Sequence, residues 1–280
     1  MNYRHSYHAG NHADVFKHAV VLRMAQLMQR KTAPFCYLDS HAGTALYDLQ
    51  GEASGKTGEY LEGIARLWGR DDLPPLWAEY VASVAAQNAD DTLRYYPGSP
   101  QLIAQGLREQ DRMILSELHP ADAATLREHF AADDRVAVHQ RDGYELAKAF
   151  LPVAEKRALW LLDPPFERAD DLERCLAAMQ VAIQRMRQTM IALWYPIKDE
   201  RLLRDFYRQV AAAGLPKVLR VELTVRPTDT TMGLNGSGLM LVNPPWPLWE
   251  ELERDLPWLA RELGHAGAGA WRLDWLAGGP

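Results

Sequence analysis

The sequence has few cysteines and no long apolar run. Its two cysteines, Cys36 and Cys175, stand far apart in the chain, so neither a disulfide framework nor a paired metal-binding motif is expected. No stretch approaches the roughly 20 consecutive apolar residues of a membrane span, and residues 1–10 are polar and lack the apolar segment of a signal peptide. We therefore expect a cytoplasmic protein without a membrane association.

The chain also lacks an excess of positive charge. It carries 31 basic and 37 acidic side chains, which gives a formal net charge of −6. Such a molecule does not hold a nucleic acid by bulk attraction, so any nucleic-acid site must be local. Basic residues do gather near the N-terminus, at Arg4, Lys17, Arg23, Arg30 and Lys31.

Two common phosphate-binding motifs are absent as well. There is no Gly-x-Gly-x-x-Gly, which argues against a nicotinamide or flavin enzyme, and there is no P-loop. The N-terminal segment is rich in histidine, and His8 and His12 stand four residues apart. Because the segment offers them no suitable acidic or thiol partner, we expect no metal site.

Apolar runs alternate with helical patterns along most of the chain. The runs predict strands at residues 35–39, 112–117, 135–138, 158–163, 190–194, 218–225 and 238–242, and a further one at 271–275. Helical patterns occupy residues 14–29, 60–68, 75–87, 121–130, 143–150 and 170–186, and the first of them is typical of an amphipathic helix. This alternation predicts an α/β fold with a mostly parallel, doubly wound sheet of about seven strands.

One spacing departs from that scheme. In dinucleotide-binding folds an acidic residue ends the second strand roughly 20 residues after the glycine turn, whereas here Glu117 follows Asp39 at roughly four times that distance. The excess predicts an insertion. We divide the chain into residues 1–46, an N-terminal helical motif with the first strand; residues 47–98, a small helical insertion; and residues 99–280, the remainder of the same domain.

The most informative motif is Asp163-Pro164-Pro165-Phe166, directly after a predicted strand. An amine on an aromatic ring is a poor nucleophile, because its lone pair is delocalised, and acceptors for its two hydrogens favour the form that can attack. Asp163 and the Pro164 carbonyl can be those acceptors, since the prolines fix the backbone. Phe166 can stack on the ring. An ionised Asp163 can also receive the proton that the amine loses.

The same motif is compatible with an ordinary turn, since prolines often follow strands. A second loop of this type, Asn243-Pro244-Pro245-Trp246, follows a late strand. In a doubly wound sheet the strand before Asp163 should lie beside the first strand, at the point where ligands bind. We therefore expect Asp163, and not Asn243, to be the functional residue.

Acidic residues also end the first three predicted strands. The turn from Asp39 to Gly43 allows the backbone to approach a ligand closely, and Asp39 suits an ammonium or sulfonium group. Glu117 can bind a ribose diol, and Asp142-Gly143 can take an adenine amine. Each carboxylate alone is compatible with a helix cap or a solvated loop, but their succession on consecutive strands favours a nucleoside cofactor.

Taken together, these residues resemble the RlmJ family of bacterial 23S ribosomal RNA adenine-N6 methyltransferases. The blocks that carry the resemblance are residues 3–14, 38–43, 57–63, 95–100, 116–120 and the Asp-Pro-Pro loop. The resemblance implies a class I, Rossmann-like methyltransferase fold with a helical insertion. It also implies S-adenosyl-L-methionine as cofactor, 23S rRNA as substrate and partner, and methylation of the N6 amino group of one adenosine by a monomer.

The resemblance further assigns roles to single residues. It implies cofactor contacts at His18, His41, Ser99, Glu117, Asp142, Gly143 and Asp163. Asp163 would be the catalytic acceptor, and Tyr3 and Phe166 would contact the target adenosine. The sequence departs from the family at Thr44-Ala45, where alanine and glycine are usual, and at Phe166, where tyrosine is commoner.

Three alternatives remain open. A DNA adenine-N6 methyltransferase would present the same amine, because a flipped adenine has the same edge in either polymer. A protein glutamine methyltransferase would favour asparagine where this chain has Asp163. A non-catalytic RNA adaptor would bind S-adenosylmethionine without turnover.

Overall fold

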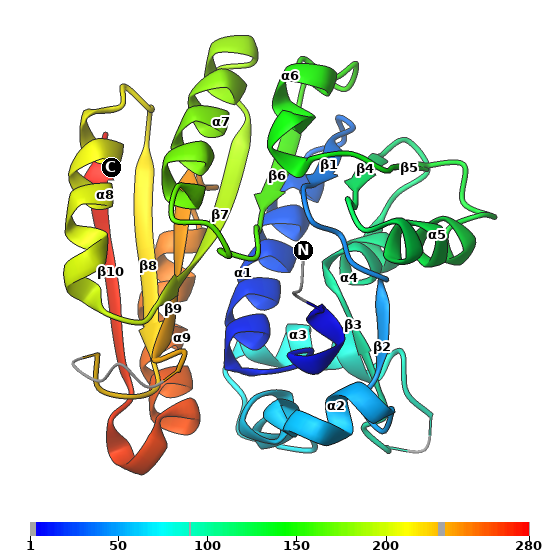
Figure 1. Ribbon diagram of the computed structural model, residues 1–280, viewed down its shortest axis with the longest axis vertical. Coiled ribbons are helices and arrows are strands. Elements are labelled where there is room, and N and C mark those ends of the chain that lie inside the picture. Colours follow the sequence, from blue (N-terminus) through cyan, green and yellow to red (C-terminus); the bar gives the residue numbers. More distant parts are fainter. Residues whose placement is uncertain (1–3, 90, 229–232, 280) are drawn as a thin grey trace.

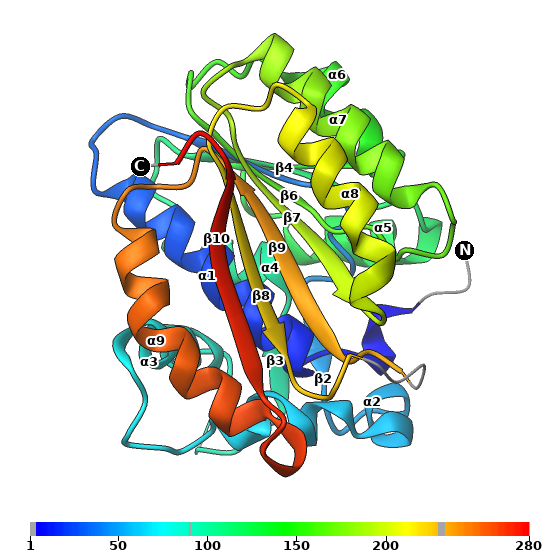
Figure 2. The same cartoon turned by 90° about the vertical axis from the view of Figure 1, so that its left-hand side faces the viewer.

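The computed structural model describes residues 4–89, 91–228 and 233–279. Its centre is an eight-stranded sheet with helices packed on both faces (Figure 1, Figure 2). In spatial order the strands are β10 (Ala270–Ala277), β8 (Val218–Thr224), β9 (Gly236–Val242), β7 (Met190–Ile197), β6 (Ala158–Leu162), β1 (Cys36–Asp39), β4 (Arg112–Ser116) and β5 (Val136–His139).

The strand directions confirm the predicted doubly wound sheet. Strands β5, β4, β1, β6 and β7 are all parallel, and β6 lies directly beside β1, with Asp39 paired to Leu161. Strand β9 then runs antiparallel to β7 and β8, and β10 runs antiparallel to β8 at the edge. The sheet has eight strands rather than about seven because β10 joins it.

Strand β7 is longer than the sequence predicts. It continues past Trp194 to Ile197 because its last residues pair with the start of β9, where Ile197 faces Gly236. Pro196 lies inside this extension and has no N–H to donate, which is why the apolar run alone suggests an earlier end.

Two hydrophobic layers explain why the parallel strands are apolar on both faces. Along β6, Leu159 and Leu161 pack on one side of the sheet, and Trp160 and Leu162 pack on the other. The first layer is covered by α1 (His12–Gln29), α3 (Pro75–Ala85), α4 (Ser99–Gly106) and α9 (Leu248–Leu263), and the second by α6 (Leu146–Phe150), α7 (Asp171–Arg185) and α8 (Glu200–Ala212). Helices α4, α8 and α9 are not among the helices predicted from the sequence.

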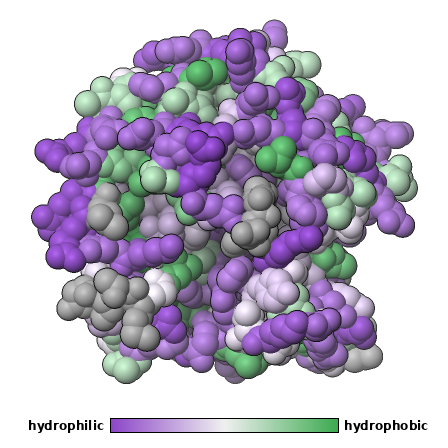
Figure 3. Space-filling view, in the orientation of Figure 1, coloured by the Kyte–Doolittle hydropathy of each residue, from purple (hydrophilic) through white to green (hydrophobic). Residues whose placement is uncertain are grey.

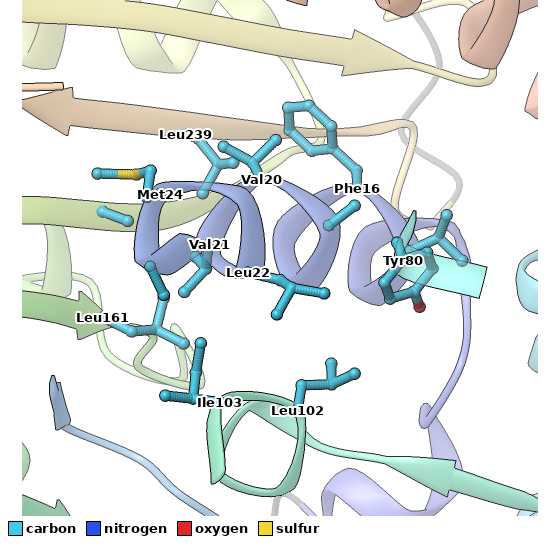
Figure 4. Packing of buried hydrophobic residues seen from close by; sticks show 14 of the residues in the cluster. Phe16, Val20, Val21, Leu22, Met24, Tyr80, Leu102, Ile103, Leu161 and Leu239 are labelled. Carbon is cyan, nitrogen blue, oxygen red and sulfur yellow. The ribbon is translucent and has the colours of Figure 1, made fainter. Parts of the chain in front are cut away.

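Helix α1 is more deeply buried than an amphipathic helix. The prediction of an amphipathic helix is wrong here, because the sheet lies on one side of α1 and helices α3, α4 and α9 surround the rest. Figure 4 shows Val20 and Val21 of α1 packed between Leu239 and Leu161 of the sheet and Ile103 of α4. Even charged residues of α1 are buried in this environment, which places them where they can act on the site described below.

The segment between β1 and β4 consists of short elements that pack against the main core. Its two ends pair as an antiparallel ribbon of β2 (Leu46–Asp48) and β3 (Tyr95–Pro97). Between them lie α2 (Glu52–Thr57), the 3-10 turns η2 (Glu59–Glu62) and η3 (Ile64–Arg66), and α3. The ribbon coincides with the two ends of the proposed insertion, and α2 packs beside the N-terminal turn η1 (His5–Tyr7).

The remaining elements are short. They are α5 (Pro120–His129), the 3-10 turn η4 (Gly143–Glu145), which precedes α6, and the 3-10 turn η5 (His265–Gly267). In the part of the chain that the structure describes, no helix is both long and apolar enough to cross a bilayer. The face shown in Figure 3 is largely hydrophilic, and its hydrophobic residues form separate patches.

The packing of α1 on the sheet predicts a large effect of a single truncation. Leu161 is fully buried in β6 beneath α1. Replacing it with alanine should lower the free energy of unfolding by about 2 to 5 kcal/mol, since both apolar burial and cavity formation contribute. Urea denaturation measures this loss. The control is Leu61→Ala in the insertion, where the leucine is 56% exposed; an equal loss in both variants would contradict the packing.

Candidate active site

The carboxyl ends of the parallel strands surround a cavity of about 430 Å³. Residues that follow β1, β4 and β6 line it together with the end of β7 and the first turns of α1. The lining residues include His5, His8, Asn11, Asp14, Lys17, His41, Gly43, Glu59, Glu117, Asp122, Asp163, Pro164, Pro165, Phe166, Trp194, Pro196 and Lys198. The cavity therefore lies where ligands bind in doubly wound sheets.

The Asp-Pro-Pro-Phe loop forms one wall of the cavity. The backbone N–H of Asp163 donates to Oγ of Ser40, at 3.0 Å, and this bond ties the loop to the turn after β1. Phe166 has a φ of 51°, a left-handed conformation that costs a non-glycine residue about 1 to 3 kcal/mol and that occurs often at functional sites. The Phe166 ring meets the Trp194 ring edge to face, with 5.7 Å between centroids.

Lysine 17 contacts the carboxylate of this loop. Its Nζ lies 2.6 Å from Oδ2 of Asp163 and 5.6 Å from the centre of the Trp194 ring. The Lys17 side chain is only 4% exposed, and that of Asp163 is 15% exposed. Among the residues that the structure describes, none donates a hydrogen bond to Oδ1 of Asp163. One oxygen is thus held by the lysine, and the other is available to a ligand.

From the sequence alone, Lys17 is recognisable only as part of a basic group near the N-terminus. The sequence shows that Asp14 and Lys17 stand three residues apart in a predicted helix, a spacing at which two side chains can pair. Their role could not be identified from this, since only the fold brings α1 to the end of β6.

Asp14 is a second carboxylate in contact with the Lys17 ammonium. Its side chain is 2% exposed, its Oδ1 is 3.0 Å from Lys17 Nζ, and its Oδ2 is 2.9 Å from His5 Nε2. Burial alone would raise the pKa of Asp14, but its interactions with His5 and Lys17 hold that pKa well below its usual value. The contact with His5 shows that the histidine-rich segment does have an acidic partner. The described residues nevertheless contain no cluster of three or more potential ligands that could hold a metal ion.

Glu117 and Gly43 form the opposite wall. One carboxylate oxygen of Glu117 accepts from the N–H of Gly43, at 2.9 Å, and the other from the N–H of His119, at 2.8 Å. Burial raises the pKa of Glu117. Gly43 has a φ of 61°, and a Cβ there would collide with the hydroxyl of Tyr47. The geometry therefore requires glycine and brings the backbone close to the cavity.

The structure shows the backbone conformation at Thr44-Ala45, where the sequence departs from the family. Ala45 has a φ of 70° and is fully buried. That conformation favours glycine, which is the residue that the resemblance leads us to expect at this position. The N–H of Thr44 donates to the hydroxyl of Tyr47, at 3.3 Å, so the turn stays closed with this sequence.

Asp39 faces away from the cavity into the protein. It is fully buried and accepts hydrogen bonds from the hydroxyls of Tyr37, at 2.8 Å, and Ser99, at 2.7 Å. Burial, partly offset by these hydrogen bonds, raises the pKa of Asp39 to about 6. In this arrangement Ser99 orients Asp39 and does not line the cavity.

The other residues expected at the cofactor occupy different places. His41 lines the cavity, and burial lowers its pKa to about 4. His18 lies deeper, with Nδ1 at 2.7 Å from the hydroxyl of Tyr96, and burial lowers its pKa to about 3. Both histidines are therefore neutral near pH 7. Tyr3, expected at the target base, lies outside the described residues.

Asp142 and Gly143 follow β5, and Gly143 contacts the backbone of Ser40, the residue before His41. Asp142 accepts from the N–H of Tyr144, at 3.0 Å, and pairs with Arg174, at 2.8 Å. A Cβ on Gly143 would collide with the carbonyl of Ser40, so a close backbone contact requires this glycine. Neither residue lines the cavity, and their expected contact with a cofactor stays a prediction.

The second Pro-Pro loop lies at the end of the sheet opposite the cavity, where the parallel strands begin. Strand β9 runs antiparallel to β7, so Asn243 follows the end of β9 near the amino end of the parallel strands, where Val242 faces Ile191. Its side-chain amide donates to the carbonyls of Arg187 and Thr189, at 3.0 and 2.9 Å. Asn243 therefore joins two segments of backbone and is remote from the cavity.

Comparisons with known proteins agree with this geometry. A family model described as "Ribosomal RNA large subunit methyltransferase D, RlmJ" matches residues 32–277. The chain is 42% identical to Ribosomal RNA large subunit methyltransferase J of Escherichia coli and 41% identical to the protein of the same name from Haemophilus influenzae, in each case over 99% of both chains. A Legionella pneumophila protein of known crystal structure is 33% identical, with a TM-score of 0.88, over 95% of this chain and 98% of its own.

Proposed function

Because the chain belongs to the RlmJ family of ribosomal RNA large subunit methyltransferases, we propose that it methylates the N6 amino group of an adenosine in 23S rRNA. The methyl donor is S-adenosyl-L-methionine. The observation that carries the choice of amine is the position of Asp163, which lies in the cavity beside the first strand with one carboxylate oxygen held by Lys17.

The residues along one wall of the cavity fit a nucleoside donor. The backbone at Gly43 leaves no room for a side chain, and Glu117 presents its carboxylate beside it, held by two N–H groups. A carboxylate in this position can accept hydrogen bonds from both hydroxyls of a ribose. When bound, S-adenosylmethionine supplies an electrophilic methyl group.

The opposite wall fits the acceptor. We propose that Oδ1 of Asp163 and the carbonyl of Pro164 accept the two hydrogens of the adenine amine, which leaves the nitrogen lone pair free to attack. Asp163 then receives the proton that the amine loses. The ammonium of Lys17 holds the other carboxylate oxygen, Oδ2, at 2.6 Å. Phe166 stacks on the base.

The remaining expectations belong to the same proposal. The chain acts in the cytoplasm on 23S rRNA as a monomer, and residues 47–98 form an insertion beside the N-terminal segment. Because the net charge is −6, contacts with the RNA are local. Lys198 supports this view, since it lies at the exposed rim of the cavity on the β7 side.

Removing the acceptor should abolish the reaction. In Asp163→Ala the rate of methyl transfer into 23S rRNA should fall by at least about 100-fold, the scale of a lost general base, while S-adenosylhomocysteine still binds. Incorporation of labelled methyl groups measures the rate, and calorimetry measures binding. Asp170→Ala is the control, since Asp170 is an exposed acid paired with Arg168 outside the cavity. Undiminished methylation by Asp163→Ala would favour a non-catalytic adaptor.

A direct comparison of two substrates tests whether the enzyme methylates RNA or DNA. Protein-free 23S rRNA and adenine-containing single-stranded DNA are offered at equal concentrations of adenine. We expect labelled methyl groups to enter the RNA, and digestion of the product should yield N6-methyladenosine. Incorporation into the DNA alone would overturn the assignment to RNA and leave the chemistry at Asp163 intact.

A further inference from the structure

Lys17 is a buried cation shared by two carboxylates. Its ammonium is 3.0 Å from Oδ1 of Asp14 and 2.6 Å from Oδ2 of Asp163, and the side chains of Lys17 and Asp14 are 4% and 2% exposed. Burying a charge without a partner is costly, and both carboxylates contact this ammonium. The mechanism above uses Asp163 and gives no role to Asp14.

Asp14 is itself fixed by several bonds. Its Oδ2 accepts from the N–H of Gly10, at 3.0 Å, and lies 2.9 Å from His5 Nε2. Its own N–H donates to the side chain of Asn11, at 3.0 Å, in the cap of α1. The carboxylate therefore has one orientation, with Oδ1 turned to Lys17. Asp14 joins the N-terminal turn to the start of α1 through His5, and it is linked to the loop of Asp163 through Lys17.

We propose that Asp14 is a positioning residue that holds the Lys17 ammonium against Oδ2 of Asp163 and so keeps Oδ1 available to the substrate amine. This inference rests on the proposed function. Without the attraction of Asp14, the Lys17 ammonium would be drawn more strongly to Asp163 and would compete for Oδ1, the acceptor that the amine needs. The 3.0 Å contact with Asp14 opposes that movement.

Asp14 also keeps Lys17 charged. Among the described residues, the groups near the ammonium include Asp14 and His18 from α1, His5 from η1, Asp163 from the loop after β6 and the Trp194 ring of β7. Asp14 and Asp163 are the carboxylates of this group. Removing one of the two carboxylates makes the buried ammonium easier to deprotonate, so activity should be lost at a lower pH than in the wild type.

The test is the pH dependence of methyl transfer into protein-free 23S rRNA by Asp14→Asn, which keeps the shape of the side chain and removes its charge. Loss of a general base typically costs about 100-fold or more in rate. Because Asp14 acts on the base only through Lys17, we expect a smaller fall in kcat, of about tenfold or more. The alkaline limb of the kcat profile should move to lower pH by about one unit or more. Asp14→Glu, which retains the charge, should keep the wild-type limb.

Two controls separate positioning from general damage to the fold. Asp255→Asn removes another buried carboxylate, which pairs with Arg254 and accepts from the N–H of Leu76 away from the cavity. It should lower the melting temperature and leave the pH profile unchanged. Calorimetry with S-adenosylhomocysteine should show that Asp14→Asn binds the product of the donor as the wild type does.

The outcomes are distinguishable. An Asp14→Asn enzyme with the wild-type alkaline limb, or with a loss of kcat equal to that of Asp255→Asn, would overturn the positioning role. If the wild type itself transfers no methyl group to 23S rRNA, the proposed function fails before the variants are compared.

Discussion

The site depends on one buried contact, the 2.6 Å approach of the Lys17 ammonium to Oδ2 of Asp163. It joins a helix that precedes the first strand to a loop that follows the fourth strand of the parallel part of the sheet. A charge pair in a buried setting is stable only with good geometry and further partners. Asp14 supplies a further partner for the lysine, and the bond from the backbone N–H of Asp163 to Oγ of Ser40 fixes the loop that carries the carboxylate. The packing of α1 on the sheet therefore also sets the chemistry of the loop.

This arrangement explains why an acidic protein can hold a local site for RNA. The net charge of −6 excludes attraction by the whole surface. Inside the cavity, however, the acids have specific partners. Asp14 is paired with Lys17 and His5, and Glu117 accepts two backbone N–H bonds. These partners fix the orientation of the carboxylates that line the cavity.

Much of the framework could be predicted from the sequence because it depends on local patterns. Apolar runs identified the strands, and the order of elements placed the strand before Asp163 beside the first strand, as the pairing of Asp39 with Leu161 confirms. The same reasoning predicted that Asn243 lies away from the ligand site. It does so because β9 runs antiparallel to β7 and therefore ends at the opposite end of the sheet. The extension of β7 through Pro196 was not predictable, since it results from pairing with a partner strand.

Other features depend on contacts between distant segments. A charged residue within a helix ordinarily faces solvent, so the pattern of α1 indicated an amphipathic helix, whereas the surrounding helices bury Lys17 and Asp14. The resemblance suggested His18 and Ser99 as cofactor contacts, but in the structure they bond to Tyr96 and Asp39. Their roles toward the cofactor remain predictions, because a local motif does not show which way a side chain turns.

The most direct test of this account is a crystal structure of the protein with S-adenosylhomocysteine and adenosine bound. The account predicts that the adenine amine lies within hydrogen-bonding distance of Oδ1 of Asp163 and of the Pro164 carbonyl, while Lys17 stays on Oδ2. A base whose amine lies away from Asp163, or one bound at the loop of Asn243, would contradict it.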